Sequence, residues 1–254
     1  MFIRAEVLCH TTLMIYNNSH LAAIYDADNP DGEDHDFFRA KAEELTALRI
    51  VDLGCGTGLL TTTLVSPDRS VVGIDPADAM LDVARACPDG QQVEWLQGTA
   101  ELIQPASVDL AIMSGNVAMH ILSDEWHKTL GHISKGLLKG GNLIFESRNP
   151  DAEAWKNWSH QVTRETPIGL LQESEETTEP DEHGIVTMKC HYRFLEDNYE
   201  LDTQQKLQFR SHQQIVEDLE AVGLVVTASY KNWHREDFTG GLEQPLMVFA
   251  AEKE

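Results

Sequence analysis

Residues 51–60 combine an apolar run, an acidic residue and three alternating glycines, a pattern well suited to holding a ligand. The glycines are Gly54, Gly56 and Gly58, and a helical pattern begins directly after them. Glycines at a strand-to-helix turn let a ligand approach bare backbone amides at a helix N-terminus. Open α/β sheets bind their ligands at this edge, where the parallel strands end. The segment therefore predicts a nucleotide-type site.

A carboxylate, Asp75, ends the next expected strand and follows Gly54 by 21 residues. An acid about 20 residues beyond such a loop accepts hydrogen bonds from ribose hydroxyls. The glycine loop and Asp75 together predict an adenosine-containing ligand. They argue against a strand-to-helix turn that binds no ligand. The spacing Gly54-x-Gly56-x-Gly58 also differs from the GxGxxG of most dinucleotide-binding loops. An NAD-type dehydrogenase, which needs that loop and a parallel sixth strand, is therefore disfavoured.

Strand and helix patterns alternate from residue 49 to residue 147, which predicts a doubly wound parallel sheet. Ser211 and Gln214 form a capping box ahead of a further helix, which stops at Gly223. Two last strands form a closing hairpin, so the sheet should have an antiparallel edge. Strands are expected at 50–53, 70–75, 93–96, 108–114, 142–147, 224–230 and 246–251, and helices at 21–26, 37–48, 59–65, 78–87 and from Ser123, the expected N-cap, to Gly140-Gly141.

The pattern changes near residue 151, where longer and half-polar strands begin. These are expected at 161–165, 185–194 and 200–209, with a hairpin turn at 196–198 and a solvated acidic loop at 173–182. Four regions follow from this organisation. They are an N-terminal extension at 1–20, a cofactor-binding core at 21–150, an antiparallel β insertion at 151–210 that covers the acceptor site, and a C-terminal helix and hairpin at 211–254 that complete the core sheet.

The composition of the 254 residues narrows the classes of partner. A formal net charge of -23 argues against a sequence-independent grip on nucleic acid and against docking on anionic membranes. The sequence has no apolar run of about 18 residues, so no membrane span is expected. No signal-peptide pattern is recognised at the N-terminus. The four cysteines (Cys9, Cys55, Cys87 and Cys190) are scattered, which is typical of a reducing compartment. A cytoplasmic protein is expected.

The segment Asp52-Leu53-Gly54-Cys55-Gly56-Thr57-Gly58, followed by Gly73-Ile74-Asp75-Pro76 and Met80-Leu81, resembles the class I S-adenosylmethionine-dependent methyltransferases. The likeness runs from about Tyr25 to the C-terminus and includes the closing hairpin. It implies a Rossmann-like α/β fold, a mostly parallel seven-stranded sheet with an antiparallel C-terminal hairpin strand. It also implies transfer of a methyl group from S-adenosyl-L-methionine to an N or O atom of a small-molecule acceptor by in-line displacement.

The resemblance assigns cofactor roles by position. Asp52 would lie near the ammonium group of the cofactor, Asp75 would hold both ribose hydroxyls, and Pro76 and Met80 would flank the adenine. Residues 98–101 resemble the Gly-Asp-Ala-Glu segment that closes the adenine pocket, although Thr99 replaces the usual Asp and one acceptor is lost. The expected cofactor-binding residues are Asp52, Gly54, Cys55, Gly56, Thr57, Gly58, Asp75, Pro76, Met80, Thr99, Ala100, Glu101, Ser114 and Gly115.

The acceptor side is expected near the end of the fourth strand. Asn116 could orient the acceptor or cap a loop, and His120 could be a general base or a core histidine. The run 25–37 resembles the N-terminal segment that covers the cofactor in small-molecule members of the family, with Tyr25 as a third catalytic candidate and His35 as a substrate contact. Arg148 could hold an acidic acceptor or form a structural ion pair.

Two other functional classes stay open on the sequence alone. One is a binding module that keeps the cofactor without transferring its methyl group. The other is a protein-modifying methyltransferase that recognises its partner through the insertion. The eleven histidines show no HxH or HxxxH spacing with acidic partners, so no metal site is expected and metal-dependent methylation is disfavoured.

Overall fold

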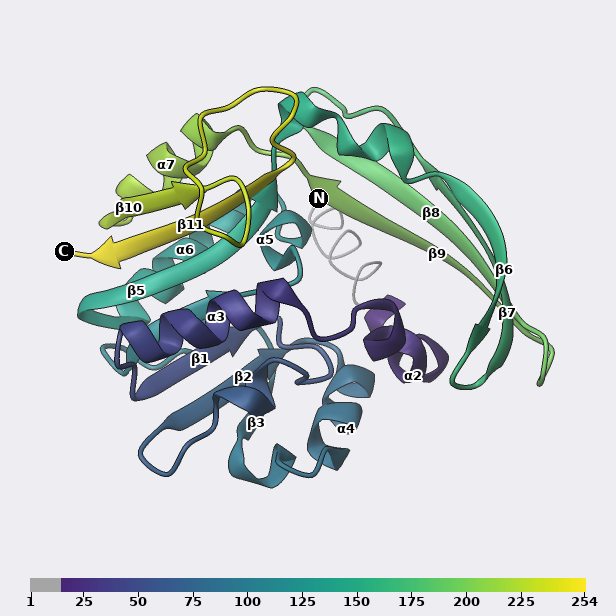
Figure 1. Ribbon diagram of the computed structural model, residues 1–254, viewed down its shortest axis with the longest axis horizontal. Coiled ribbons are helices and arrows are strands. Elements are labelled where there is room, and N and C mark those ends of the chain that lie inside the picture. The colour runs from purple at the N-terminus through teal and green to yellow at the C-terminus, as the bar shows by residue number, and fades with distance from the viewer. Residues whose placement is uncertain (1–14) are drawn as a thin grey trace, which may run out of the picture.

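The structure is a computed structural model that describes residues 15–254, and it contains two β-sheets of different kinds (Figure 1). The larger sheet has seven strands in the order β10-β11-β5-β4-β1-β2-β3. Neighbouring strands are parallel, except that β11 runs antiparallel to both β5 and β10. The strands are β1 (Arg49–Leu53), β2 (Ser70–Asp75), β3 (Glu94–Gln97), β4 (Val108–Met113), β5 (Leu137–Arg148), β10 (Leu224–Tyr230) and β11 (Leu246–Lys253). This confirms the predicted fold class.

The helices of the larger sheet cover both of its faces, and each face has its own apolar core. On one face α6 and α7 pack through Trp126, Leu130 and Ile215. On the other face α3 packs through Phe38 beside Ile50 of β1. The helices are α2 (Ser19–Asp28), α3 (Glu33–Glu44), α4 (Asp78–Ala86), α5 (Val117–His120), α6 (Ser123–Gly136) and α7 (His212–Glu220). None of the helices in residues 15–254 is long and apolar enough to cross a membrane.

The smaller sheet is an antiparallel meander of four strands that follows β5 in the chain. It stands away from the larger sheet and curves toward α2 (Figure 1). Its apolar side chains contact α2 at one end, through Leu171 and Phe194, and Met119 of α5 at the other. The strands are β6 (His160–Thr166), β7 (Gly169–Thr177), β8 (Ile185–Phe194) and β9 (Tyr199–Gln208).

Strand β7 corrects one sequence expectation, because residues 173–177 were expected in a solvated loop. All five pair with β8, and residues 173–175 pair with β6 as well. Side chains alternate between the two faces of β7, so Glu173 and Glu175 share one face while Ser174 and Glu176 share the other. Glu173 and Glu175 therefore lie on the face that looks toward α2, where they line a cavity, while Glu176 is exposed.

The helix expected at 59–65 is only a 3₁₀ helix over Thr61–Leu64. Threonine hydroxyls compete for the backbone there: Thr62 donates to the Gly58 carbonyl and Thr63 to the Leu60 carbonyl. The α6 helix also differs from expectation at both ends. Ser123 makes no capping bond and its N–H donates to Gln208, and the helix ends at Gly136, so that Gly140-Gly141 lie within β5.

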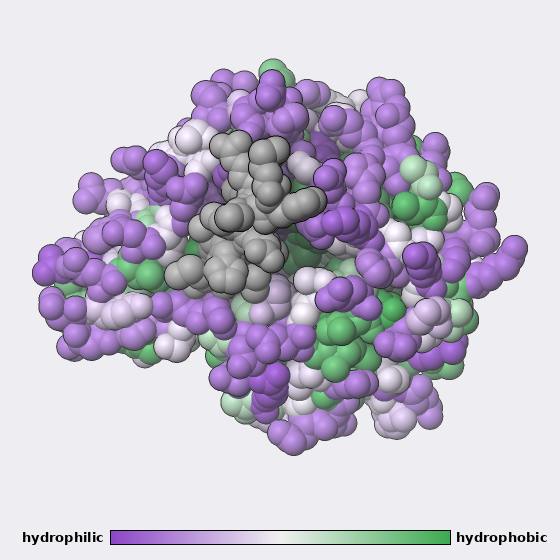
Figure 2. Space-filling view, turned by 180° about the vertical axis from the view of Figure 1, so that it is seen from behind, coloured by the Kyte–Doolittle hydropathy of each residue, from purple (hydrophilic) through white to green (hydrophobic). Residues whose placement is uncertain are grey.

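The N-terminal extension expected at 1–20 falls mostly outside the described residues, and only residues 15–20 can be compared. Asn18 caps α2 by accepting hydrogen bonds from the N–H groups of His20 and Leu21. The face of the molecule in Figure 2 is mainly hydrophilic, with smaller hydrophobic areas.

Candidate cofactor and acceptor site

The glycine loop follows β1, and its backbone requires glycine at all three alternating positions. The φ angles are +74° at Gly54, +54° at Gly56 and +75° at Gly58, a region that side chains with a Cβ rarely adopt. A Cβ at Gly54 would also lie 2.4 Å from Val117, and one at Gly58 would lie 2.5 Å from the Trp95 ring. The loop thus presents bare backbone at the edge of the sheet, as the sequence predicts.

The buried carboxylate of Asp75, at the end of β2, fixes this loop. Its Oδ2 accepts the Gly56 N–H at 2.9 Å, and its Oδ1 accepts the Ala77 N–H at 2.8 Å. Burial raises the pKa of Asp75, and these two hydrogen bonds oppose the rise. Each carboxylate oxygen can accept more than one hydrogen bond, so Asp75 can hold the loop and still accept from a ligand hydroxyl.

Asp52, the last polar residue of β1, is a buried carboxylate whose hydrogen bonding is incomplete. Its Oδ2 accepts the Thr61 hydroxyl at 2.6 Å, while its Oδ1 has no partner among residues 15–254. The side chain is 1% exposed, and burial raises its pKa to about 6. A buried carboxylate oxygen without a donor is costly. An ammonium group on a bound ligand would supply that donor.

A second buried carboxylate, Glu146 of β5, lies near the loop that follows β4. Its Oε1 accepts the N–H of Asn116, and its Oε2 has no partner among residues 15–254. Burial raises its pKa to about 7. Sequence reasoning placed Glu146 at the correct edge of the sheet but gave it no role. The sequence carried no clear signal for its burial, because Glu146 is followed by the polar residues Ser147 and Arg148 at the end of β5.

Asn116 and Arg148 lie together, a contact that the sequence did not predict. Asn116 has a left-handed backbone with φ +62°, and it is the N-cap of α5, directly after Ser114 and Gly115. Nε of Arg148 donates to its amide oxygen at 3.1 Å. Among residues 15–254, Arg148 forms no ion pair within 4.0 Å. Its side chain contacts the Asn116 amide instead.

Tyr25 of α2 lies across the glycine loop. Its Cε1 is 3.8 Å from the position a Cβ would take at Gly56, and its hydroxyl is 3.8 Å from the same position at Gly115. The Thr57 hydroxyl donates to Asp26, which ties α2 to the loop. Burial, with Asp75 next in importance, raises the pKa of Tyr25 to about 12, so its phenol is neutral at physiological pH. The α2 helix therefore covers the loop.

His120 ends α5 and is half-buried. Burial lowers its pKa to about 4, so the ring is neutral near pH 7. Its Nδ1 has no partner within the described part of the chain, and its Nε2 lies 3.5 Å from the hydroxyl of Tyr16. Tyr16 was missed because residues 1–20 carry no recognisable motif. The two rings meet edge to face with their centroids 5.6 Å apart.

The other predicted site residues are spread over the same edge of the sheet or beyond it. Met80 is buried in α4 and clusters with Ala22 and Ala77. Thr99 and Glu101 are exposed, on either side of the buried Ala100. His35 binds Asp31 at 2.9 Å at the start of α3 and lines no part of the cavity described next. Cys55 is buried, and Pro76 is half-buried.

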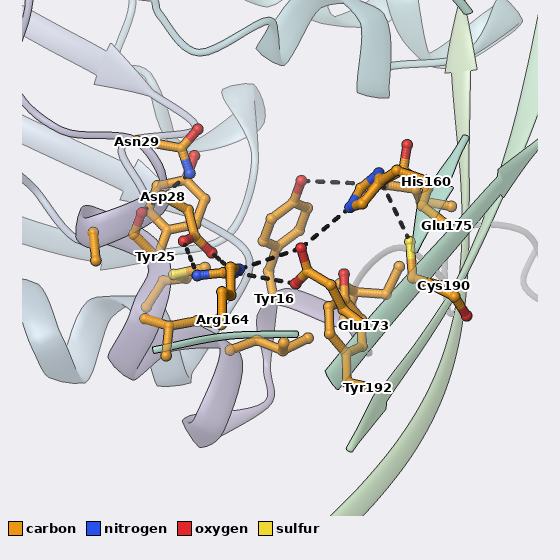
Figure 3. Close-up of a pocket in the computed structure, with 17 residues that line it drawn as sticks. Tyr16, Tyr25, Asp28, Asn29, His160, Arg164, Glu173, Glu175, Cys190 and Tyr192 are labelled. Carbon is orange, nitrogen blue, oxygen red and sulfur yellow. Dashed lines mark hydrogen bonds and ion pairs between the residues drawn. The ribbon is translucent and has the colours of Figure 1, made fainter. Parts of the chain in front are cut away.

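A cavity of about 570 Å³ lies between α2 and the inner face of the four-stranded sheet (Figure 3). Tyr25 and Met80, which were expected beside the cofactor, form part of its wall. The opposite wall consists of polar side chains from the smaller sheet, including Arg164, Glu173 and Glu175. The cavity therefore joins the candidate cofactor site to the smaller sheet.

Arg164 of β6 crosses one side of this cavity and joins the sheet to α2. Its Nη1 lies 2.7 Å from Oδ1 of Asp28, and its Nη2 lies 2.8 Å from Oδ2, a bidentate pair. The same guanidinium donates to Glu173 at 3.1 and 3.3 Å. Among residues 15–254, no group of three or more His, Cys, Asp or Glu side chains is arranged to hold a metal ion.

The chain is similar to known proteins in sequence and in fold. Residues 50–141 match the family model of the methyltransferase domain. Trans-aconitate 2-methyltransferase of Azoarcus sp. (strain BH72) is 41% identical over 127 residues, which are 48% of this chain and 46% of that protein. The chain thus spans less than half the length of this curated relative.

Solved structures match nearly the whole chain. An S-adenosylmethionine-dependent methyltransferase from Clostridium acetobutylicum aligns with a TM-score of 0.76 at 17% identity, covering 92% of this chain and 98% of that one. The sugar N-methyltransferase KedS8 from Streptoalloteichus sp. aligns with a TM-score of 0.69 at 15% identity, covering 91% of each chain. The fold is that of the class I S-adenosylmethionine-dependent methyltransferases.

Proposed function

We propose that this protein is an S-adenosylmethionine-dependent methyltransferase that acts on a small-molecule acceptor at an N or O atom. The observation that carries the proposal is the pair of buried acids at the glycine loop. Asp75 is anchored by the Gly56 N–H and retains acceptor capacity, and Asp52 has one oxygen without a donor among residues 15–254. Ribose hydroxyls and an ammonium group, both present in this cofactor, would satisfy these two acids.

The cofactor, when bound, supplies an activated methyl carbon on a sulfonium. Asp52 and Asp75 would hold the cofactor, and the methyl carbon it supplies would pass to an acceptor N or O atom by in-line displacement. The protein residues align the acceptor and exclude water. Tyr25 would close the cofactor side from α2, and Asn116, held by Glu146 and Arg148, would line the side where the acceptor reacts.

Calorimetry with S-adenosylhomocysteine is the direct test of the cofactor. We expect binding by the wild-type protein and at least a tenfold loss of affinity in Asp75→Ala. Asp75→Asn, which keeps one acceptor oxygen for the loop, should lie between the two. Asp78→Ala is the matched control, because Asp78 is three residues further on, in the first turn of α4, and pairs with Arg85. Absence of binding by the wild-type protein would sink the proposal.

Transfer is tested separately, by incubating the protein with methyl-labelled cofactor and a metabolite extract. Labelled products of low mass support the small-molecule activity. Cofactor binding without any labelled product would instead indicate a binding module, and label on protein would indicate a protein-modifying enzyme. The relatives compared above are named for different acceptors, trans-aconitate and a sugar, so their names leave the acceptor class open.

A further inference from the structure

The cavity between α2 and the four-stranded sheet contains one carboxylate without an ion pair, Glu175 of β7. Among residues 15–254, its only side-chain hydrogen bond is with the Cys190 thiol at 3.8 Å, and no cationic group lies within 4.0 Å. Thiols are weak donors. Figure 3 shows Glu175 and Cys190 beside one another in the cavity wall. A half-buried carboxylate in such a place favours a cationic partner from outside the protein.

The other charges of the cavity wall already balance one another. Arg164 pairs with both Asp28 and Glu173, as described above. His160 lies 2.9 Å from the Trp158 carbonyl through Nδ1 and 3.2 Å from Glu173 through Nε2. Both partner atoms are hydrogen-bond acceptors, so both ring nitrogens of His160 donate when the ring is protonated. Because these bonds stabilise the protonated form, the pKa of His160 is raised. When His160 is protonated, the wall has two cations against three carboxylates, and Glu175 is the carboxylate without an ion pair.

Three tyrosine rings line the same cavity: Tyr16, Tyr25 and Tyr192. Tyr16 and Tyr25 meet edge to face with centroids 6.2 Å apart. Burial raises the pKa of all three phenols, so the rings are neutral. Neutral aromatic faces attract cations through their quadrupoles, and quaternary and protonated amines are bound in this way. The rings thus favour the same sign of ligand charge as Glu175.

We propose that the acceptor carries a protonated amine, which Glu175 binds in this cavity. This inference rests on the proposed function and adds the acceptor class to it. Tyr16 and Tyr192 would contact the apolar part of the acceptor, and Tyr25 would separate it from the glycine loop. A carboxylate acceptor is disfavoured, because it would bring a second negative charge beside Glu175 with no free cation in the described cavity wall to offset it.

Labelling of Cys190 measures the charge preference of the cavity without knowledge of the natural acceptor. Two methanethiosulfonates of similar size serve as probes, one with an ammonium group and one with a sulfonate. Each forms a disulfide with the thiol and releases methanesulfinate. Their rates at Cys190 are measured by peptide mass spectrometry on protein saturated with S-adenosylhomocysteine. The ratio of the two rates cancels the thiolate fraction, and the same ratio at Cys87 corrects for the overall charge.

We expect the ammonium-to-sulfonate ratio at Cys190 to exceed that at Cys87 by about tenfold, since a single charge acts at short range in a partly buried site. Glu175→Gln should remove most of this excess. Glu176→Gln is the matched control, because Glu176 is the next residue of the same strand and is exposed. This control variant should leave the ratio unchanged. Equal ratios at the two cysteines, an excess that survives in Glu175→Gln, or no labelling of Cys190 by either reagent would overturn the proposal.

The labelled products of the transfer assay give a second, independent readout. The proposal requires the methylated product to bind to a cation exchanger and to keep its label in mild base. A base-labile methyl ester would overturn it. Failure of S-adenosylhomocysteine binding counts against the proposed function instead, and the labelling ratio can still be measured without that ligand, so the two failures are distinguishable.

Discussion

The N–H of Asn116 donates to the buried carboxyl group of Glu146, so an acid from β5 holds the loop that follows β4. The other oxygen of that carboxyl has no partner among residues 15–254. The side chain is 3% exposed, and burial raises its pKa from the usual 4.5 to about 7. Because the loop carries Ser114, Gly115 and Asn116, the ionisation of Glu146 bears directly on the candidate site.

This carboxyl makes the stability of the ligand-free protein depend on pH. The folded state binds the proton of Glu146 more tightly than the unfolded chain, so the free energy of unfolding falls as pH rises from about 4.5 through 7 and levels off above. Glu146→Gln keeps an acceptor for Asn116 and removes the titration. Across this pH window the free energy of unfolding of the wild-type protein should fall by about 3 kcal/mol more than that of the variant.

Urea unfolding of both proteins between pH 4.5 and 8.5 checks this prediction. Other groups with raised pKa values, such as Asp52, are common to both proteins and cancel in the difference. Glu94→Gln, at an exposed position, is the control and should give a flat difference curve. A flat curve for Glu146→Gln as well would contradict the assignment of the raised pKa to this side chain.

Gly58 should tolerate no side chain. Its φ of +75° disfavours any residue with a Cβ, and that atom would lie 2.5 Å from the Trp95 ring. Gly58→Ala should lower the free energy of unfolding by about 2–4 kcal/mol through strain and overpacking. Gly131→Ala is the control: Gly131 lies within α6 with nothing within 4 Å of a new Cβ, so this change should stabilise by up to about 1 kcal/mol. Equal urea midpoints for the two variants would contradict the prediction.

The larger sheet and the cofactor side of the site could be predicted because they depend on local patterns. Apolar periodicity gives the strands, and the spacing from Gly54 to Asp75 brings the loop and the acid to neighbouring strand ends. The register of parallel strands then sets which residues share an edge. The capping box of Ser211 and Gln214 was equally local, and both of its hydrogen bonds are present.

The acceptor side could not be predicted, since its contacts join residues far apart in sequence. Arg164 meets Asp28 across 136 positions, and Tyr16 meets His120 across 104. The carboxylates of β7 looked like a solvated run, because sequence alone does not show that β6 pairs beside them and that α2 lies across the cavity they line. Glu146 was passed over for a similar reason: its burial depends on packing around β5 that no single segment specifies.

The Asp28–Arg164 pair should control the mobility of α2. Both side chains are partly exposed, so the pair contributes no more than about 1 kcal/mol to stability. Asp28→Asn should speed hydrogen exchange of the amides of Ser19–Asp28 by about threefold to fivefold, with little change in the urea midpoint. Asp82→Asn removes a pair with Arg85 inside α4 and should leave α2 exchange unchanged. Unaltered exchange in Asp28→Asn would show that apolar contacts alone hold α2.

The ring of Tyr25, rather than its hydroxyl, should support the bound cofactor. The ring of Tyr25 lies against Gly56, whereas its hydroxyl lies near Gly115. Tyr25→Phe should therefore keep the S-adenosylhomocysteine affinity within about twofold, whereas Tyr25→Ala should lower it about tenfold or more by opening the loop to water. Tyr230→Ala, which removes a ring that packs against Phe37 of α3, controls for the loss of an aromatic side chain elsewhere. Calorimetry on the three variants separates these outcomes. Wild-type affinity in Tyr25→Ala would mean that α2 does not cover the cofactor, and an equal loss in Tyr25→Phe would assign the contact to the hydroxyl.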